Sequence, residues 1–270
     1  MDLMTILGWM IGIGAVGYVL NAGSTTLFFL NPRAAILVFG GTLGATFITF
    51  PWSLLRRVPG AVAMFIFPGR RESADSVMSR LLALAARARQ SSMESLEMDM
   101  RRTKDQFLAN GLKMISDGLP AQAIRENLEK EIYFIRLRHT EISNIFRNMA
   151  TYSPIFGLLG TLVGVVEVMM NLTDPRTMGM HMALAMTATF YGIFGANFLF
   201  LPIAGKLQAY SEQELFLKEV MIEGILSIQK QEIPAILSRR LESYLNRSRR
   251  GKIGSSRTQN IQTIEKRDVA

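Results

Sequence analysis

The sequence predicts an all-α, polytopic membrane protein with four transmembrane helices, a large helical cytoplasmic loop and a helical C-terminal tail. Of its 270 residues, 49% are hydrophobic and only 19% are charged, with a mean hydropathy of +0.21. Soluble domains carry about 25% charged residues, so the chain is too apolar for a single soluble globule. In addition, the apolar residues gather in four runs, and most basic residues lie in two segments outside those runs.

Each of the four apolar runs is long enough to cross a bilayer. They cover Leu3–Leu20, Ala34–Trp52, Ser153–Leu172 and Met182–Leu201, the last continuing to Gly205. At about 18 to 24 residues each, they match a hydrocarbon core of about 30 Å. These lengths argue against the alternative, buried helices of a soluble protein. We expect the first run to be a helix rather than a signal peptide, because it lacks a basic n-region and a second run follows at once.

The basic residues predict the orientation of these helices. Sixteen Lys and Arg residues lie between Arg56 and Arg147, and twelve more lie from Lys206 onward. The turn Asn21–Pro32 has no charge, and the turn Thr173–His181 has few. Because Lys and Arg are enriched on the cytoplasmic side, we expect the loop, the tail and both termini there.

The cytoplasmic segments follow the helical period. Apolar residues repeat every three or four positions from Val77 to Ala88, from Met100 to Ile115 and from Ile124 to Phe146. Asp117-Gly118 should end the second of these helices, and Pro120 suits the first turn of the next. No helix breaker separates that third helix from the third apolar run, so one helix should continue from cytosol into membrane.

The tail repeats this pattern over a shorter length. Leu215–Ile228 is amphipathic, Pro234 interrupts it, and Ile236–Leu245 forms a short helix. From Ser248 onward the chain is polar and basic, which favours disorder.

These segments define five regions. Residues 1–55 hold transmembrane helices 1 and 2, residues 56–150 form the cytoplasmic helical loop, and residues 151–207 hold transmembrane helices 3 and 4. Residues 208–247 form the cytoplasmic C-terminal helices, and residues 248–270 form a disordered tail.

Small residues recur at the spacing of helix contacts within the runs. They form three G-x-x-x-G pairs: Gly8 and Gly12, Gly40 and Gly44, and Gly160 and Gly164. Such pairs let helix backbones approach closely. Packing within the chain and association with other chains both remain open.

Two prolines and two threonines stand out in the third and fourth runs. Pro154 and Pro202 lie near the cytoplasmic ends and remove a backbone donor, which suits either a simple kink or a hinge. Thr161 and Thr189 place hydroxyls in apolar helices. Such a hydroxyl either bonds its own helix or offers an oxygen to a passing ion or water.

Glu167 is the only acid inside a run, and an intramembrane carboxylate suggests function. It follows Thr161 by six positions, about 240° away in projection, so the two do not share a face. It lies near the outer end, where ions could enter from interfacial water. Of the two histidines, we expect His139 on a solvated surface and His181 capping the outer turn.

Several functions are disfavoured by what the sequence lacks. It has no cysteine and only two histidines, so it predicts no disulfide and no metal centre. It contains none of the P-loop, nucleophile-elbow or zinc-protease motifs, so we expect no enzyme. The basic stretch Arg239–Arg250 could bind nucleic acid, but its place beside a membrane bundle favours membrane lipid or a solvated tail.

The motifs of the third and fourth runs resemble a known family. Residues 152–166 read Tyr-Ser-Pro-Ile-Phe-Gly-Leu-Leu-Gly-Thr-Leu-Val-Gly-Val-Val, and residues 187–197 read Thr-Ala-Thr-Phe-Tyr-Gly-Ile-Phe-Gly-Ala-Asn. Residues 201–207 read Leu-Pro-Ile-Ala-Gly-Lys-Leu. This pattern resembles the flagellar motor stator A subunit, of the MotA/PomA type in the MotA/TolQ/ExbB ion-channel superfamily. TolQ and ExbB have one span before their cytoplasmic loop, whereas this chain has two.

The resemblance implies a bacterial inner (cytoplasmic) membrane protein that forms a homopentamer around two stator B subunits. Each B subunit has a single transmembrane helix with an ion-binding aspartate, and a peptidoglycan-binding domain. Ion flow, of Na+ or H+, would turn the ring, and the loop would push on the flagellar rotor switch protein. No cofactor and no nucleic acid are implied.

The resemblance also assigns roles to residues. It implies that Pro154 and Pro202 couple ion binding to shape change, that Thr161 and Thr189 line the ion path, and that Arg89 and Glu97 contact the rotor. Glu167 departs from the pattern, which often has a small apolar residue there. Gln90 also departs from it, replacing a frequent basic residue.

The coupling ion and the driven machine remain open. In the resembled stators the sodium type tends to carry threonine at the position of Thr161 and the proton type alanine, which favours sodium here. The alternative is an energising subunit of another ion-driven envelope machine, TolQ/ExbB-like, in gliding or transport. A self-contained transporter would need paired internal carboxylates, and only Glu167 is present.

Overall fold

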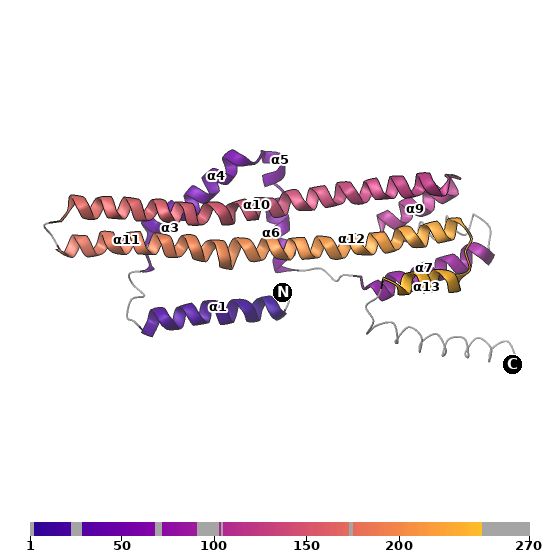
Figure 1. Cartoon of the computed structure of the whole chain (residues 1–270), viewed down its shortest axis with the longest axis horizontal. Helices are drawn as coiled ribbons and strands as arrows, with labels where there is room; N and C mark the ends of the chain where they lie inside the picture. The colour runs from indigo at the N-terminus through magenta and orange to yellow at the C-terminus, as the bar shows by residue number, and fades with distance from the viewer. Residues whose placement is uncertain are drawn as a thin grey trace. The chain divides into compact units, whose positions relative to one another are not determined.

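The computed structural model of the chain describes residues 3–22, 29–67, 72–90, 103, 105–172 and 175–244, and within these ranges every regular element is a helix (Figure 1). Two compact units are formed, one from residues 1–70 and 136–212, the other from residues 71–135 and 213–270. Four helices are long and apolar enough to cross a membrane, as the sequence predicts: Leu3–Ala22, Pro32–Thr49, Ala121–Met170 and Thr177–Gln229.

The first two spans lie in the first unit. The first is α1 (Leu3–Ala22), and the second joins α3 (Pro32–Ala35), the π-helix η1 (Ile36–Gly40) and α4 (Gly41–Thr49). The Asn31 side chain caps α3, accepting hydrogen bonds from the backbone N–H groups of Arg33 and Ala34. The predicted end at Trp52 is wrong by three residues. Phe50 takes an extended conformation before Pro51, which disfavours helix in the residue before it.

Two short helices follow that the sequence analysis missed, α5 (Trp52–Leu55) and α6 (Val58–Ile66). The α6 segment is apolar on every side, so it carries no helical period to detect. Its Ala61 packs in a cluster with Ile145, Phe146 and Met149 of the third span's helix.

The third span belongs to the 50-residue helix α10 (Ala121–Met170), which confirms the single helix predicted across the loop boundary. The fourth joins α11 (Pro175–Phe194), the π-helix η2 (Gly195–Phe200) and α12 (Leu201–Gln229). The helix begins at Pro175, not Met182, so the predicted outer turn Thr173–His181 is wrong over most of its length. Proline suits a first helical turn, because its missing N–H would have no partner there anyway.

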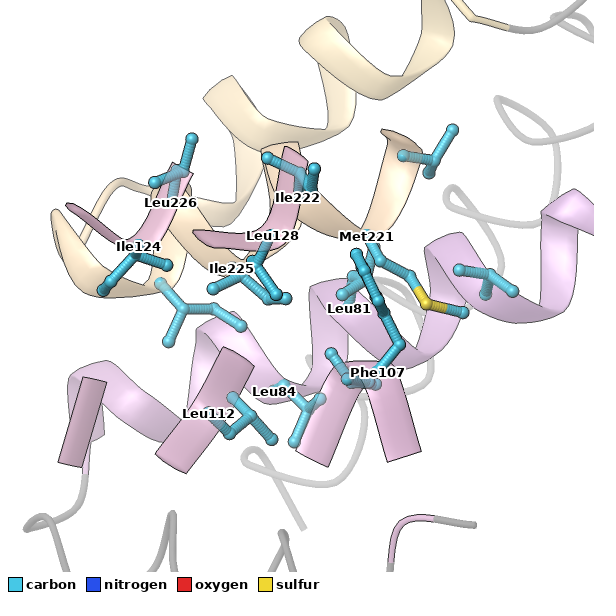
Figure 2. Packing of buried hydrophobic residues seen from close by; sticks show 14 of the residues in the cluster. Leu81, Leu84, Phe107, Leu112, Ile124, Leu128, Met221, Ile222, Ile225 and Leu226 are labelled. Carbon is cyan, nitrogen blue, oxygen red and sulfur yellow. The ribbon is translucent and has the colours of Figure 1, made fainter. Parts of the chain in front are cut away.

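The second unit contains α7 (Ala74–Gln90), α9 (Gln106–Ser116), α13 (Pro234–Glu242) and parts of α10 and α12. The predicted break is confirmed, since α9 ends at Ser116 and Gly118 adopts a φ of 75°. Figure 2 shows the core, in which Leu81, Phe107, Leu128 and Ile225 are labelled. Met100 and the tail from residue 248 lie outside the described residues.

Candidate functional site

The third and fourth spans meet through residues with almost no side chain. A Cβ added to Gly157 would lie 2.9 Å from the Ala188 carbonyl oxygen, and one added to Gly192 would lie 2.7 Å from the Ser153 carbonyl oxygen. Real Cβ atoms essentially never come within 3.0 Å of a neighbour, so only glycine fits at either position. We call this contact the glycine seam, formed by Ser153, Gly157, Gly160 and Gly164 of α10 with Ala185, Ala188 and Gly192 of α11.

The three glycine pairs of the sequence have different surroundings. Gly160 and Gly164 belong to the seam, so their role is packing within the chain. Gly12 faces the ring of Phe198, whereas Gly8 and Gly44 have nothing within 4 Å of an added Cβ. Within the described residues, space therefore remains beside Gly8 and Gly44.

The second span covers one side of the seam. Val38 is buried in a cluster with Leu184 and Ala188 of α11. On the α10 side, a Cβ added to Gly41 would clash with the ring of Phe156. The second span thus contacts both helices of the seam.

Thr161 and Thr189 flank the seam on a common side. Thr161 follows Gly160 and Thr189 follows Ala188, and those two seam residues are in contact. Because α10 and α11 run antiparallel (Figure 1), residues one position after paired seam residues lie on the same side of the contact. Pro154, which follows Ser153, lies on that side as well.

The hydroxyls of both threonines donate to their own helices. Thr161 Oγ1 lies 2.6 Å from the Leu158 carbonyl oxygen, and Thr189 Oγ1 lies 3.3 Å from that of Ala185. A hydroxyl has one hydrogen but two lone pairs, so each oxygen can still accept a hydrogen bond or face a cation. The two roles considered from the sequence, bonding to the helix and facing an ion, are therefore compatible.

The residues one turn before and after each threonine are apolar and exposed. Leu158 and Val165 flank Thr161 with 61% and 45% of their surface exposed, and Met186 and Ile193 flank Thr189 with 62% and 53%. We call these six residues the threonine face. Such a wide apolar surface with two central hydroxyls fits contact with another helix.

The two prolines occupy different settings. Pro154 lies inside α10 and cannot donate to the carbonyl of Ala150, as an ordinary residue would. Its Cα packs against Gly192 in the seam. Pro202 is the second residue of α12, which follows η2 directly, so a proline and a π-helical segment occur close together in the fourth span.

Glu167 pairs across the seam with His181, a contact that the sequence analysis missed. Glu167 Oε2 lies 2.6 Å from His181 Nδ1, with 33% and 21% of the two side chains exposed. The prediction that His181 caps an outer turn is wrong, because His181 lies within α11. His139 is not merely solvated either, since its Nδ1 lies 3.0 Å from Ser211 Oγ. Both partners come from another helix, so only the helix pairing reveals them.

The predicted rotor residues belong to the loop. Arg89 is exposed near the end of α7, a helix that buries Leu81 and Leu84 in the core. Glu97 lies outside the described residues. The role of this charged pair stays a prediction.

The second unit contains an ion-pair network. Glu223 lies 2.8 Å from Arg125 Nη2 and 3.6 Å from Arg240 Nη1, and Arg240 also reaches Glu232 at 3.1 Å. Burial alone would raise the pKa of Glu232. Hydrogen bonds from Ser227 and Arg240 and the nearby positive charges outweigh burial and lower that pKa below its ordinary value. The network joins α10, α12 and α13. Among the described residues no group of His, Asp and Glu could hold a metal ion.

Known proteins are similar to this chain in sequence and in fold. A family model for the MotA/TolQ/ExbB proton channel family matches residues 99–220. Motility protein A of Treponema phagedenis is 34% identical over 91% of this chain and 95% of its own length. An uncharacterized Bacillus subtilis protein, YtxD, is 35% identical over 90% of this chain and 89% of its own. The structure of the flagellar MotAB stator complex from Bacillus subtilis superposes with a TM-score of 0.85 and 30% identity, covering 93% of this chain and 98% of the matched chain.

Proposed function

The chain belongs to the MotA family of flagellar stator subunits, and from that membership we propose how its own residues pass an ion and transmit force. It is an ion-channel subunit of the flagellar motor stator and a multi-pass protein of the inner membrane. As a channel component it is not an enzyme and works without a cofactor. Relatives named for motility favour the flagellar motor over a TolQ/ExbB-like machine.

The threonine face is the observation that carries the proposed mechanism. The structure related to this chain is a complex with a B subunit, and a MotB-type partner and a multimeric assembly follow from it. We propose that the B helix lies against the threonine face and contributes the ion-binding aspartate. The face offers that carboxylate an apolar wall with hydroxyl oxygens from two helices. A homopentamer would present five such faces to the partner helices.

We propose sodium as the coupling ion. A sodium ion must exchange much of its hydration shell for protein oxygens, because hard cations bind oxygen ligands. Thr161 and Thr189 each offer an oxygen with free lone pairs on the same side of the seam. A proton can travel through water to a carboxylate and needs neither hydroxyl. Glu167, paired with His181 near the outer end, would act where the ion enters.

The test of the ion path is swimming speed against sodium concentration at fixed pH, in cells that carry this chain and its B partner as their only stator. We expect Thr161→Ala to raise the sodium concentration at half-maximal speed about tenfold or more. Thr161→Ser keeps the hydroxyl, so its sodium concentration at half-maximal speed should stay near the wild-type value. Thr151→Ala is the matched control, since Thr151 bonds its own helix at Arg147 and lies off the seam. Speed that ignores sodium but collapses with a protonophore would identify protons instead.

We propose that the ring transmits force to the rotor through the cytoplasmic loop. We propose that Arg89 and Glu97 engage the rotor switch protein and that both termini lie in the cytoplasm. Arg89→Glu should abolish or strongly slow swimming while the amount of membrane-inserted protein stays within about twofold, because exposed charges contribute only about 0 to 1 kcal/mol to stability. Arg87→Glu, on the same exposed end of α7, is the control. If the amount of membrane-inserted protein falls instead, Arg89 stabilises the fold and its role at the rotor is contradicted.

Membrane lipid remains a proposed partner for the basic stretch Arg239–Arg250. Arg240 already pairs with Glu223 and Glu232, so any lipid contact would come from the other residues of the stretch.

A further inference from the structure

The fourth span is interrupted where η2 meets Pro202. A π-helix contains an extra residue per turn and is common at functional sites. Pro202, two residues after η2, has no N–H to donate to the helical ladder. Residues 193–203 therefore have the least regular backbone hydrogen bonding of the span, and we call them the π–proline segment.

Two buried serines of α10 hold the helix at either end of this segment. Ser153 Oγ donates to the Gly192 carbonyl oxygen at 3.0 Å, just before the segment begins. Ser143 Oγ donates to the Ala204 carbonyl oxygen at 3.0 Å, just after it ends. Ser153 and Ser143 are 0% and 1% exposed. The two carbonyls lie twelve residues apart along the fourth span's helix.

Between the serines the contact is apolar. Ile145, Phe146 and Met149 of α10 form one cluster with Ala196 and Phe200 of η2. The serines are ten residues apart, and both face the fourth span's helix, since each donates to one of its carbonyls. The π–proline segment thus packs against apolar side chains of α10, with one serine hydrogen bond just outside each end.

The position of Ser153 links this segment to the other proline. Ser153 immediately precedes Pro154, and its neighbours in the seam are glycines without side chains that could absorb a displacement. A movement of α10 at Pro154 therefore acts on Gly192 through the Ser153 hydrogen bond and through backbone contact.

We propose that Ser153 and Ser143 are positioning residues that fix the two ends of the π–proline segment. Through their hydrogen bonds, a displacement of α10 at Pro154 changes the conformation of the fourth span's helix at Pro202. Without these bonds, α10 would slide along the seam and leave that helix unchanged. Ser153 passes the displacement to the start of the segment, and Ser143 keeps α12 in register beyond it. The proposal rests on the stator function given above.

The test uses Ser153→Ala and Ser143→Ala in the assembled stator, with Ser153→Cys as a second variant of similar size. Thr151→Ala is the matched control, because its hydroxyl bonds only within α10 among the contacts described. Three quantities are measured: the amount of assembled complex, the maximal swimming speed, and the ion concentration at half-maximal speed.

We expect the alanine variants to assemble normally and to lose about threefold or more of maximal speed, while the half-saturating ion concentration changes less than about twofold. This separates them from Thr161→Ala, which should change the half-saturating concentration. The thiol of Ser153→Cys is a weaker hydrogen-bond donor than a hydroxyl, so the maximal speed of this variant should lie between those of Ser153→Ala and the wild type.

Unchanged maximal speed in both alanine variants would overturn the proposal, and so would a loss of speed that only follows a loss of assembled complex. Failure of all three serine variants to assemble would also overturn it, because the hydroxyls would then be structural. If instead the wild-type chain with its B partner does not power swimming, it is the stator function that fails.

Discussion

The two units of this protein differ in the kind of packing that stabilises each of them internally. The second unit buries large side chains such as Leu81, Phe107 and Ile225 in one core and adds an ion-pair network around Glu223. In the first unit, the glycine seam joins the third and fourth spans through glycines, alanines and a hydroxyl-to-carbonyl bond, and a smaller cluster around Phe146 and Phe200 adds large side chains. Water drives the first kind of packing through the hydrophobic effect. Lipid does not, so the second kind relies on close backbone approach and hydrogen bonds.

This difference suits the two tasks of a stator subunit. Interlocked large side chains resist displacement, because a densely packed core transmits strain. A seam without interdigitating side chains offers few obstacles to small movements along it, apart from the Ser153 hydrogen bond within it and the Ser143 hydrogen bond beyond it. In the proposed function, the first unit would change shape with each ion, and the second would act as a rigid body on the rotor.

The largest expected effect comes from filling the seam. Gly192→Ala places a methyl group 2.7 Å from the Ser153 carbonyl oxygen and 3.1 Å from two backbone Cα atoms, none of which can rotate away. We expect loss of motility and a destabilisation of about 3 kcal/mol, at the upper end for overpacking. The measurement is swimming together with the yield of complex in detergent.

The control for this substitution is Gly179→Ala on the same helix, where an added Cβ meets nothing within 4 Å. Gly179→Ala should leave both swimming and the yield of complex in detergent unchanged. If Gly192→Ala behaves like Gly179→Ala, the spans are not held by backbone contact and the contrast between the units disappears.

A smaller effect is expected in the second unit, where polar contacts supplement a large core. Glu223→Gln removes the charge that two arginines share, at a side chain only 16% exposed. We expect a loss of about 1–2 kcal/mol, because hydrogen bonds to charged groups are the stronger ones. Thermal unfolding or protease resistance of the full complex would measure it.

Glu129→Gln provides the matched comparison, because Glu129 pairs with the same Arg125 but at 3.4 Å and on the surface. That change should cost about 0.3–0.5 kcal/mol. Equal effects at the two positions would mean that the network stabilises no better than a surface pair.

Much of the fold follows from the sequence because span length and helical period are local signals. The four spans, the 50-residue α10 and the break at Gly118 were predicted in this way. The helix α6 was not, because a segment that is apolar on every side has no period. The partners of Glu167 and His139 were not predicted either, since each lies on another helix, and the sequence alone does not give the register of the two helices.

The smallest expected effect is a dependence on pH in the second unit. The Glu232 carboxylate accepts hydrogen bonds from Ser227 Oγ and Arg240 Nη2, and its folded pKa is lower than the ordinary value of 4.5. A depressed carboxyl pKa contributes stability above the unfolded pKa, and this contribution is lost as the pH falls through the folded value. Resistance of α13 to proteolysis by an acid-stable protease should therefore be constant near neutrality and decline below about pH 4.5.

Other carboxylates titrate in the same range, so the informative quantity is the difference in protease resistance between the wild type and Glu232→Gln. That difference should be largest near neutral pH and vanish at the acid end, where both side chains are uncharged. A difference that is instead the same at every pH would show that Glu232 acts through its shape and hydrogen bonds and not through its charge.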